Sequence, residues 1–167
     1  MPRLSAGILL YRRQGEGVEL LLVHPGGPFW AKKDESSWSI PKGEYAEGDD
    51  ELAAAKREFR EETGFDAPAG EPAPLGQVKY SNKLLTVWAV PGSIDARRVS
   101  SNTFTMEWPP KTGKQQEFPE VDRAGWFQPA VAKQKLVGGQ VELVDRLCEQ
   151  LGISSEMGEN PSQMSLL

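Results

Sequence analysis

Residues 43–65, GEYAEGDDELAAAKREFREETGF, decide the fold of this chain, because they join a turn-rich loop to a helix with acids on one face. The loop half contains Gly43, Gly48 and several acids. The helical half is predicted to begin at residues 49–51, where unpaired N–H groups attract negative charge. It is predicted to end at Gly64, because glycine readily adopts the left-handed conformation that closes a helix.

Three glutamates of this helix, Glu58, Glu61 and Glu62, are spaced by three and four residues and therefore share one face. Their carboxylates repel one another unless a cation lies between them, and hard oxygen ligands are what Mg²⁺ and Mn²⁺ prefer. The spacing therefore predicts a divalent metal site. The alternative is a solvated helix face, which would show no response to metal. The apolar side of the helix is predicted to pack on a sheet through Leu52, Ala53, Ala55 and Phe59.

The full pattern of the stretch resembles the Nudix hydrolase box, G-x5-E-x7-R-E-U-x-E-E-x-G-U, in which U is a bulky apolar residue. Gly43 matches the first glycine, and residues 57–65, REFREETGF, match the second half. Asp49 stands where the family usually has Glu. In the family this acid helps to hold the box arginine, here Arg57. The other interpretation of Asp49 is a helix N-cap.

The resemblance implies an α/β fold, the Nudix α/β/α sandwich with a mixed β-sheet between helices, over residues 1–152. It also implies metal-dependent hydrolysis of a pyrophosphate bond. The metal would be Mg²⁺, with Mn²⁺ as the alternative. It would be bound by Glu58, Glu61 and Glu62 and by the backbone of Gly43. Such ions offset the charge of a phosphate chain and lower the pKa of a bound water.

The resemblance leaves the general base open between two regions of the chain. One candidate is Glu58, oriented by Arg57. The other is an acid that precedes the aromatic pair at residues 126–127, where relatives often carry a further ligand or a base. Glu120 is the first choice there and Glu117 the second.

The segment WSIPKG at residues 38–43 resembles the form that precedes the box in diadenosine-polyphosphate hydrolases, and Tyr80 resembles a marker of the same branch. The resemblance implies substrate contacts by Trp38, Lys42 and Tyr80, with Lys83 close to phosphate. Tyr80 would equally suit a half-buried strand position, and Lys83 a solvated strand edge. The favoured substrate is a dinucleoside polyphosphate such as Ap4A. Alternatives are a modified nucleoside triphosphate, cleaved for nucleotide sanitation, and a nucleotide-sensing Nudix module without activity.

The loop at residues 25–34 mixes Phe29 and Trp30 with lysines, a composition that suits base stacking and phosphate binding or a simple surface lid. His24 is the only histidine of the chain, which excludes a histidine-rich metal site. It is expected to be a strand-end residue rather than a catalyst.

The rest of the chain shows alternating and continuous apolar runs. These predict strands at residues 5–12, 18–24, 75–80 and 83–90 and around Phe104 and Met106. Helices are predicted over residues 129–137 and 140–151, with Cys148 on the buried side of the second. Residues 153–167 have no period and are predicted to form a mobile tail.

Composition limits the partners of this chain. A net charge of −5 argues against a polyanion-binding surface spread over the whole protein, so no stable nucleic-acid binding is expected. A single cysteine cannot form an internal disulfide, which fits a reducing compartment. No apolar run is long enough for a membrane span. We therefore expect a cytoplasmic protein that binds a small nucleotide.

Overall fold

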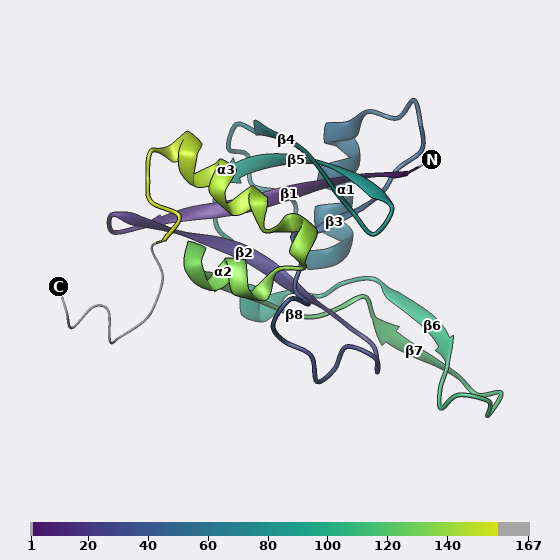
Figure 1. Cartoon of the computed structure of the whole chain (residues 1–167). Coiled ribbons are helices and arrows are strands. Elements are labelled where there is room, and N and C mark those ends of the chain that lie inside the picture. The colour runs from purple at the N-terminus through teal and green to yellow at the C-terminus, as the bar shows by residue number, and fades with distance from the viewer. Residues whose placement is uncertain (1, 157–167) are drawn as a thin grey trace, which may run out of the picture.

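The computed structural model describes residues 2–156 (Figure 1). Its centre is a six-stranded sheet with strand order β4-β5-β1-β2-β8, in which β3 pairs with β1 beside that path. The strands of this sheet are β1 (Arg3–Gln14), β2 (Gly17–Pro25), β3 (Lys42–Glu44), β4 (Ala73–Tyr80), β5 (Lys83–Pro91) and β8 (Val121–Phe127). Because β1 runs parallel to β5 and antiparallel to β2, the sheet is mixed. This confirms the predicted α/β architecture.

Helices cover both faces of the sheet: α1 (Glu51–Thr63) packs on one face, and α2 (Pro129–Lys135) and α3 (Glu142–Leu151) pack on the other (Figure 1). Side chains along β1 alternate between the two cores, as the period of two in a strand requires. Ile8 and Leu10 pack toward α1 and Leu9 toward α3. Two short 3₁₀ turns, η1 (Ala96–Arg98) and η2 (Gly138–Gln140), complete the helical elements.

The boundaries of α1 follow from its caps. Asp50, rather than Asp49, is the N-cap, and its side chain accepts a hydrogen bond from the backbone N–H of Ala53. The interpretation of Asp49 as the cap was therefore wrong. Gly64 closes the helix in the left-handed conformation, with φ of 79°, as predicted.

The buried stripe of α1 consists of Ala54, Ala55, Phe59 and Thr63. Ala53 is exposed, so its predicted burial was wrong. With 3.6 residues per turn, a residue six positions before Phe59 lies roughly 120° around the helix from it, and the sheet does not reach that far.

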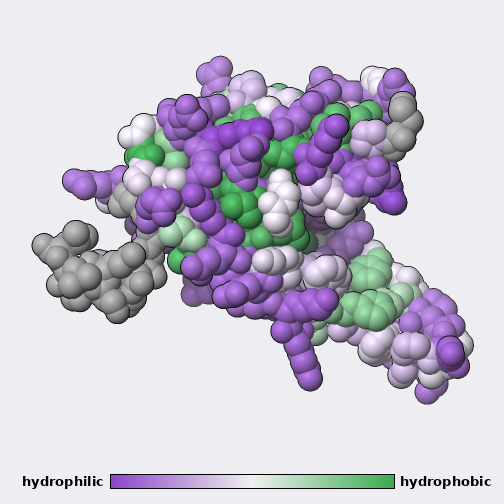
Figure 2. Space-filling view, in the orientation of Figure 1, coloured by the Kyte–Doolittle hydropathy of each residue, from purple (hydrophilic) through white to green (hydrophobic). Residues whose placement is uncertain are grey.

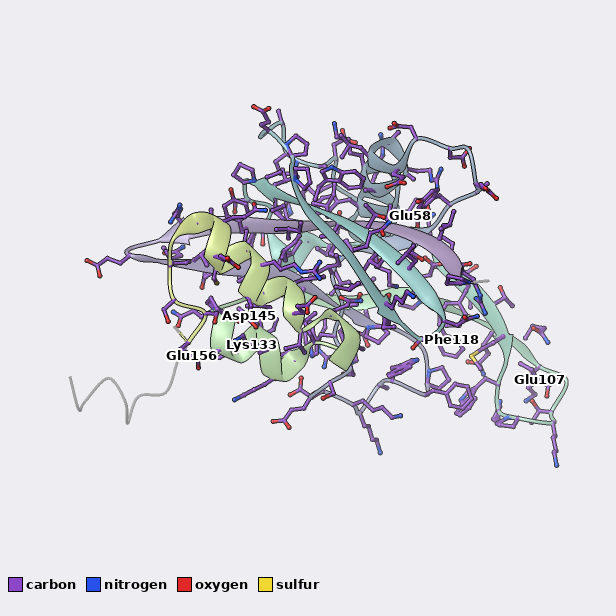
Figure 3. All side chains as sticks on the ribbon, turned by 45° about the horizontal axis from the view of Figure 1, so that its top comes forward. Glu58, Glu107, Phe118, Lys133, Asp145 and Glu156 are labelled. Atoms are coloured by element: carbon purple, nitrogen blue, oxygen red, sulfur yellow. The ribbon has the colours of Figure 1, made fainter. Side chains whose placement is uncertain are left out.

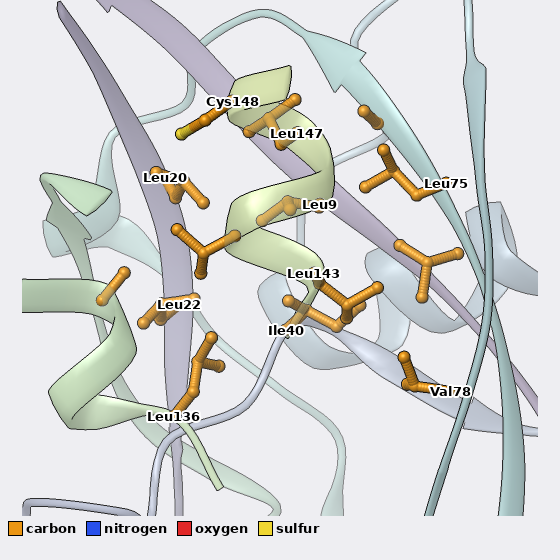
Figure 4. Close-up of a cluster of buried hydrophobic side chains, with 14 of the residues drawn as sticks. Leu9, Leu20, Leu22, Ile40, Leu75, Val78, Leu136, Leu143, Leu147 and Cys148 are labelled. Carbon is orange, nitrogen blue, oxygen red and sulfur yellow. The ribbon is translucent and has the colours of Figure 1, made fainter. Parts of the chain in front are cut away.

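The second core, shown in Figure 4, packs α3 against β1 and β2 through Leu143, Leu147 and Cys148. The buried position of Cys148 is thereby confirmed. The chain stays attached to this core beyond α3. Ile153 packs against it, and Lys133 of α2 lies 3.7 Å from the carboxylate of Glu156 (Figure 3). Residues 153–156 of the predicted tail thus contact the sheet domain, and residues 157–167 lie outside the described part.

A separate hairpin, β6 (Thr103–Glu107) and β7 (Gln115–Pro119), projects from the sheet domain (Figure 1). The sequence predicts its first strand, but β7 is polar and had no sequence signal of its own. Figure 2 shows hydrophobic side chains at the surface of this projection. Phe104 and Phe118 face each other there with ring centroids 6.0 Å apart. Within residues 2–156, no helix has the length and apolar character needed to cross a bilayer.

Candidate active site

The box glycine and the first box glutamate meet where β3 passes α1. A Cβ atom built on Gly43 would lie 1.7 Å from Oε1 of Glu58, so a side chain larger than hydrogen cannot fit beside this carboxylate. Arg57 donates from Nη2 to the other carboxylate oxygen of Glu58 at 3.3 Å and to the carbonyl of Glu44 at 3.4 Å. Glu58 is therefore held between a glycine backbone and a guanidinium.

Asp49 acts within the loop rather than on Arg57. Its carboxylate accepts a hydrogen bond from the backbone N–H of Ala46 at 3.2 Å, which closes a turn before the helix. The guanidinium of Arg57 instead uses the carbonyl of Glu44. In this chain, therefore, Asp49 does not hold Arg57, and a backbone carbonyl binds the arginine instead.

The carboxylates of the box helix lie in an acidic, poorly solvated environment. Burial, and next the neighbouring carboxylate of Glu61, raises the pKa of Glu58. Burial raises the pKa of Glu62 to about 7, although the backbone N–H of Lys42 donates to its Oε1 at 3.1 Å. Each raised pKa means that the nearby cation, Arg57 for Glu58 and Lys42 for Glu62, does not offset the burial of the ionised carboxylate.

A divalent cation fits this donor set. It supplies the missing positive charge to hard oxygen ligands and favours their ionised forms. Within residues 2–156, no group of three His, Cys, Asp or Glu side chains is already arranged as a metal cage. A cation would therefore draw Glu58, Glu61 and Glu62 closer together, which the long glutamate side chains permit.

A pocket of about 230 Å³ opens beside these acids. Its charged lining consists of Glu62 and Glu120 together with Lys42 and Lys83. Its aromatic lining consists of Trp30 and Tyr80, and the remaining lining residues are Val23, Pro25, Ser37, Ser39, Ser81, Val121, Val137 and Gln140. Acids, lysines and aromatic rings around one hollow are the groups needed to bind a metal, a phosphate chain and a base.

The ammonium of Lys83 and the hydroxyl of Tyr80 are partly desolvated. Burial, and next the nearby Lys42, lowers the pKa of Lys83, while burial raises the pKa of Tyr80. The Tyr80 hydroxyl is buried and has no hydrogen-bond partner among the described residues. A ligand oxygen in the pocket would satisfy it.

Six residues predicted for the site do not line the pocket, and four of them, Gly43, Arg57, Glu58 and Glu61, belong to the box. The other two are Trp38 and Glu117. Trp38 is 5% exposed in the core, where its Nε1 donates to Oδ1 of Asp34 at 2.8 Å. Glu117 is an exposed residue of β7 opposite Thr105. Of the two acids considered in this region, the structure therefore brings Glu120 to the pocket.

Several pocket residues had no assigned role in the sequence. Gln140 is fully buried, accepts the backbone N–H of Ile40 at 3.0 Å and donates to Oγ of Ser39 at 3.0 Å. These contacts join positions about 100 residues apart, so no local pattern indicates them. For Trp30, the aromatic and basic composition of its loop did indicate base stacking.

Residues 1–147 match the family model described as NUDIX domain. The chain belongs to the Nudix family, as the box predicted. The family generally uses divalent metal ions.

Among curated proteins, the chain is 33% identical over 98 residues to an 8-oxo-(d)GTP phosphatase of Mycolicibacterium smegmatis. That match covers 51% of this chain and 28% of the relative, so the chain spans well under half the length of that protein.

Solved structures share the fold at lower identity. A binary complex of the C. elegans Ap4A hydrolase has a TM-score of 0.63 and 20% identity, covering 89% of this chain and 98% of that one. The NUDIX domain of Shewanella oneidensis NrtR, complexed with ADP ribose, has a TM-score of 0.57 and 17% identity, covering 90% and 89%. Both likenesses show the fold.

The raised pKa of Glu62 predicts a pH effect on the metal-free protein. Because the folded pKa of about 7 lies above the unfolded value, Glu62 ionises more easily in the unfolded chain, and its contribution to stability falls as pH rises from about 4.5 to 7. Glu62→Gln keeps an oxygen that accepts the backbone N–H of Lys42, and it removes the loss of stability that ionisation causes. In urea unfolding with EDTA, we expect the free energy of unfolding of the variant to exceed that of wild type by a margin that grows with pH and reaches ~3 kcal/mol at pH 7.5.

The control for this experiment is Glu117→Gln, which changes an exposed carboxylate outside the pocket. Its free energy of unfolding should follow wild type at every pH. A Glu62→Gln variant that also follows wild type at every pH would contradict the burial of an uncompensated carboxylate.

Proposed function

We propose that this chain hydrolyses a pyrophosphate bond in a nucleoside diphosphate-linked substrate, with a dinucleoside polyphosphate such as Ap4A as the favoured substrate. The observation that carries the proposal is the single pocket in which Glu62 and Glu120 lie with Lys42, Lys83 and aromatic rings. Two carboxylates, two lysines and two aromatic residues around one pocket suit a metal-bound phosphate chain that continues into a nucleoside. The likeness of the fold to an Ap4A hydrolase is consistent with this choice.

In this proposal Glu58, Glu61 and Glu62, with the backbone of Gly43, hold Mg²⁺, and Mn²⁺ is the alternative. The bound ion offsets phosphate charge and acidifies a water molecule. Arg57 holds the carboxylate of Glu58 in place through the 3.3 Å contact.

The remaining roles belong to the pocket wall. Lys42 and Lys83 would bind phosphate oxygens, and the buried hydroxyl of Tyr80 would donate to one. The indole of Trp30 would flank the base, because it is 39% exposed and lines the hollow. Glu58 and Glu120 are the candidate bases, and the position of Glu120 on the pocket wall favours it over Glu117. Such a reaction needs positioning and charge stabilisation more than a covalent nucleophile.

Hydrolysis of a modified nucleoside triphosphate is the second candidate. The observation that favours it is the 33% identity to the 8-oxo-(d)GTP phosphatase over about half of this chain. The two candidates share the metal site and differ in what lies beyond the phosphate chain, a second nucleoside or solvent.

We expect chromatography to separate these candidates after incubation with Ap4A, 8-oxo-dGTP, ADP-ribose and GTP, each with Mg²⁺ and with EDTA. Metal-dependent release of ATP and AMP from Ap4A supports the favoured substrate. Release of a monophosphate and pyrophosphate from 8-oxo-dGTP supports the second candidate. If none of the four compounds is turned over but one of them binds in a metal-dependent way, both candidate activities are overturned and a nucleotide-sensing module is indicated.

We further propose a cytoplasmic location, for which the single cysteine, buried in α3, is the supporting observation. The net charge of −5 makes a small nucleotide a better partner than a nucleic acid.

A further inference from the structure

His24 lies near the end of β2, is fully buried, and has no part in the chemistry above. Its Nδ1 lies 2.9 Å from Oδ1 of Asp122, and its Nε2 lies 2.6 Å from the carbonyl oxygen of Lys33. An ionised carboxylate and a backbone carbonyl accept hydrogen bonds and donate none. Both nitrogens of the ring therefore face acceptors.

Only the doubly protonated imidazolium carries an N–H on both nitrogens. A neutral ring that donates to Asp122 would set the lone pair of Nε2 against the carbonyl of Lys33. The opposite tautomer would set a lone pair against the carboxylate. Either arrangement sets a lone pair of the buried ring against an oxygen acceptor at hydrogen-bond distance, which is unfavourable. The hydrogen-bond geometry thus selects the cationic ring.

Among the charged groups of the neighbouring segments, Asp122 is the one that contacts the ring. On β8, the carboxylate of Asp122 lies against the ring and also accepts from Arg123 at 3.4 Å. In the loop before Trp38, the carboxylate of Asp34 accepts a hydrogen bond from Nζ of Lys135, which extends from the end of α2. The ammonium of Lys33 lies over the indole of Trp30, 4.9 Å from its centroid, rather than over the histidine. The ring thus has a direct anionic partner.

The ring is connected to the pocket through a short turn. The backbone N–H of Lys33 donates to the carbonyl of Trp30 at 2.9 Å, and the carbonyl of Lys33 in turn faces His24. The indole of Trp30 lines the pocket. Beside it, Phe29 packs edge-on against Trp108 of the projecting hairpin at 5.5 Å. Backbone groups of Lys33 thus connect the buried ring to the backbone of Trp30, a residue that lines the pocket.

We propose that His24, as an imidazolium, is a positioning residue that fixes the turn at residues 30–33 and with it the indole of Trp30 on the pocket wall. Loss of the Nε2 proton breaks the contact with Lys33 and releases this turn, while Nδ1 keeps its hydrogen bond to Asp122. The inference rests on the proposed function for its consequence, since Trp30 would flank the substrate base. The position of Trp30 is nevertheless measurable without a substrate.

The first test is nuclear magnetic resonance on the tag-free, nucleotide-free protein. The chain has one histidine, so ring signals report on His24 alone. The indole N–H of Trp30 is identified by its absence from the spectrum of Trp30→Phe. We expect Nε2 to lose its proton first as pH rises, and the Trp30 signal to shift with the same midpoint. Loss of the Nδ1 proton first, or a Trp30 signal that ignores the titration, would overturn the proposal.

A matched pair of substitutions separates the two ring contacts. The amide nitrogen of Gln lies as many bonds from Cα as Nε2, whereas that of Asn lies as many bonds from Cα as Nδ1. His24→Gln should keep the contact with Lys33 and hold the Trp30 signal at its low-pH position at every pH. His24→Asn should keep only Asp122 and show the released signal at every pH. Identical Trp30 signals in the two variants would contradict the proposal.

The wild-type titration needs no substitution, so it decides the proposal even if one variant does not fold. A second measurement links the turn to substrate, with Ap4A and Mg²⁺ as the probe. His24→Asn should raise KM about 10-fold with kcat within about 2-fold of wild type. In a Trp30→Ala background it should add no further change. An additive effect in that background would show that His24 does not act through Trp30, whereas absence of wild-type turnover would count against the proposed substrate alone.

Discussion

Replacing Glu61 by Gln is expected to lower kcat by at least about 100-fold, because an amide cannot supply the negative charge that holds a divalent cation at the box helix. The loss should appear in kcat rather than in folding. Glu61 lies at the surface of α1 beside Glu58, and its carboxylate raises the pKa of that residue through repulsion. The metal-free variant should therefore melt at the wild-type temperature or slightly above it.

Steady-state kinetics over a range of Mg²⁺ concentrations and thermal melting with EDTA measure this prediction. Glu117→Gln is the matched control, since it removes an exposed carboxylate of β7 outside the pocket and should leave kcat unchanged. Wild-type turnover by Glu61→Gln would falsify the assignment of Glu61 as a metal ligand.

Replacing Gly43 by Ala is expected to lower kcat about 100-fold, because displacement of a catalytic group by about 1 Å costs that much. The added Cβ would lie 1.7 Å from Oε1 of Glu58, so the carboxylate must leave its place beside Arg57. The close approach, rather than an unusual backbone angle, makes glycine necessary at this position. The atoms that the new Cβ would meet belong to the flexible side chain of Glu58, so the free energy of unfolding should change much less than kcat.

The matched control is Gly138→Ala, because a Cβ at Gly138 would meet no atom within 4 Å. Kinetics at saturating Mg²⁺ and urea unfolding of both variants make the comparison. The assignment of Glu58 to the site would be wrong if Gly43→Ala retained the kcat of Gly138→Ala.

The features predicted well from the sequence are those that depend on neighbouring residues. The glutamates of α1 share a face because of helical periodicity alone, and Gly64 ends the helix through its own backbone freedom. The strands β1 and β5 are continuous apolar runs, so their burial was predictable without knowledge of their partners. These local rules predicted the family and the shared face of the three glutamates.

The features predicted poorly depend on contacts between distant segments. The segment at residues 38–43 resembles a family motif, but its sequence does not tell whether Trp38 faces a ligand or the core. The neighbours that bury it are His24 and Phe127, more than ten positions away. β7 had no apolar signal because it pairs only with β6 on a projecting hairpin.

By itself, the sequence determined that this chain is a Nudix domain with carboxylates spaced to share a metal, because helix periodicity and capping act over a few residues. Only the tertiary structure decided which groups meet those carboxylates. Pairing of β2 with β8 brings Asp122 to His24, and the packing of η2 brings Gln140 to Ser39. A pocket wall consists of side chains from strands and loops far apart in the chain, so its composition follows from how the sheet and helices pack.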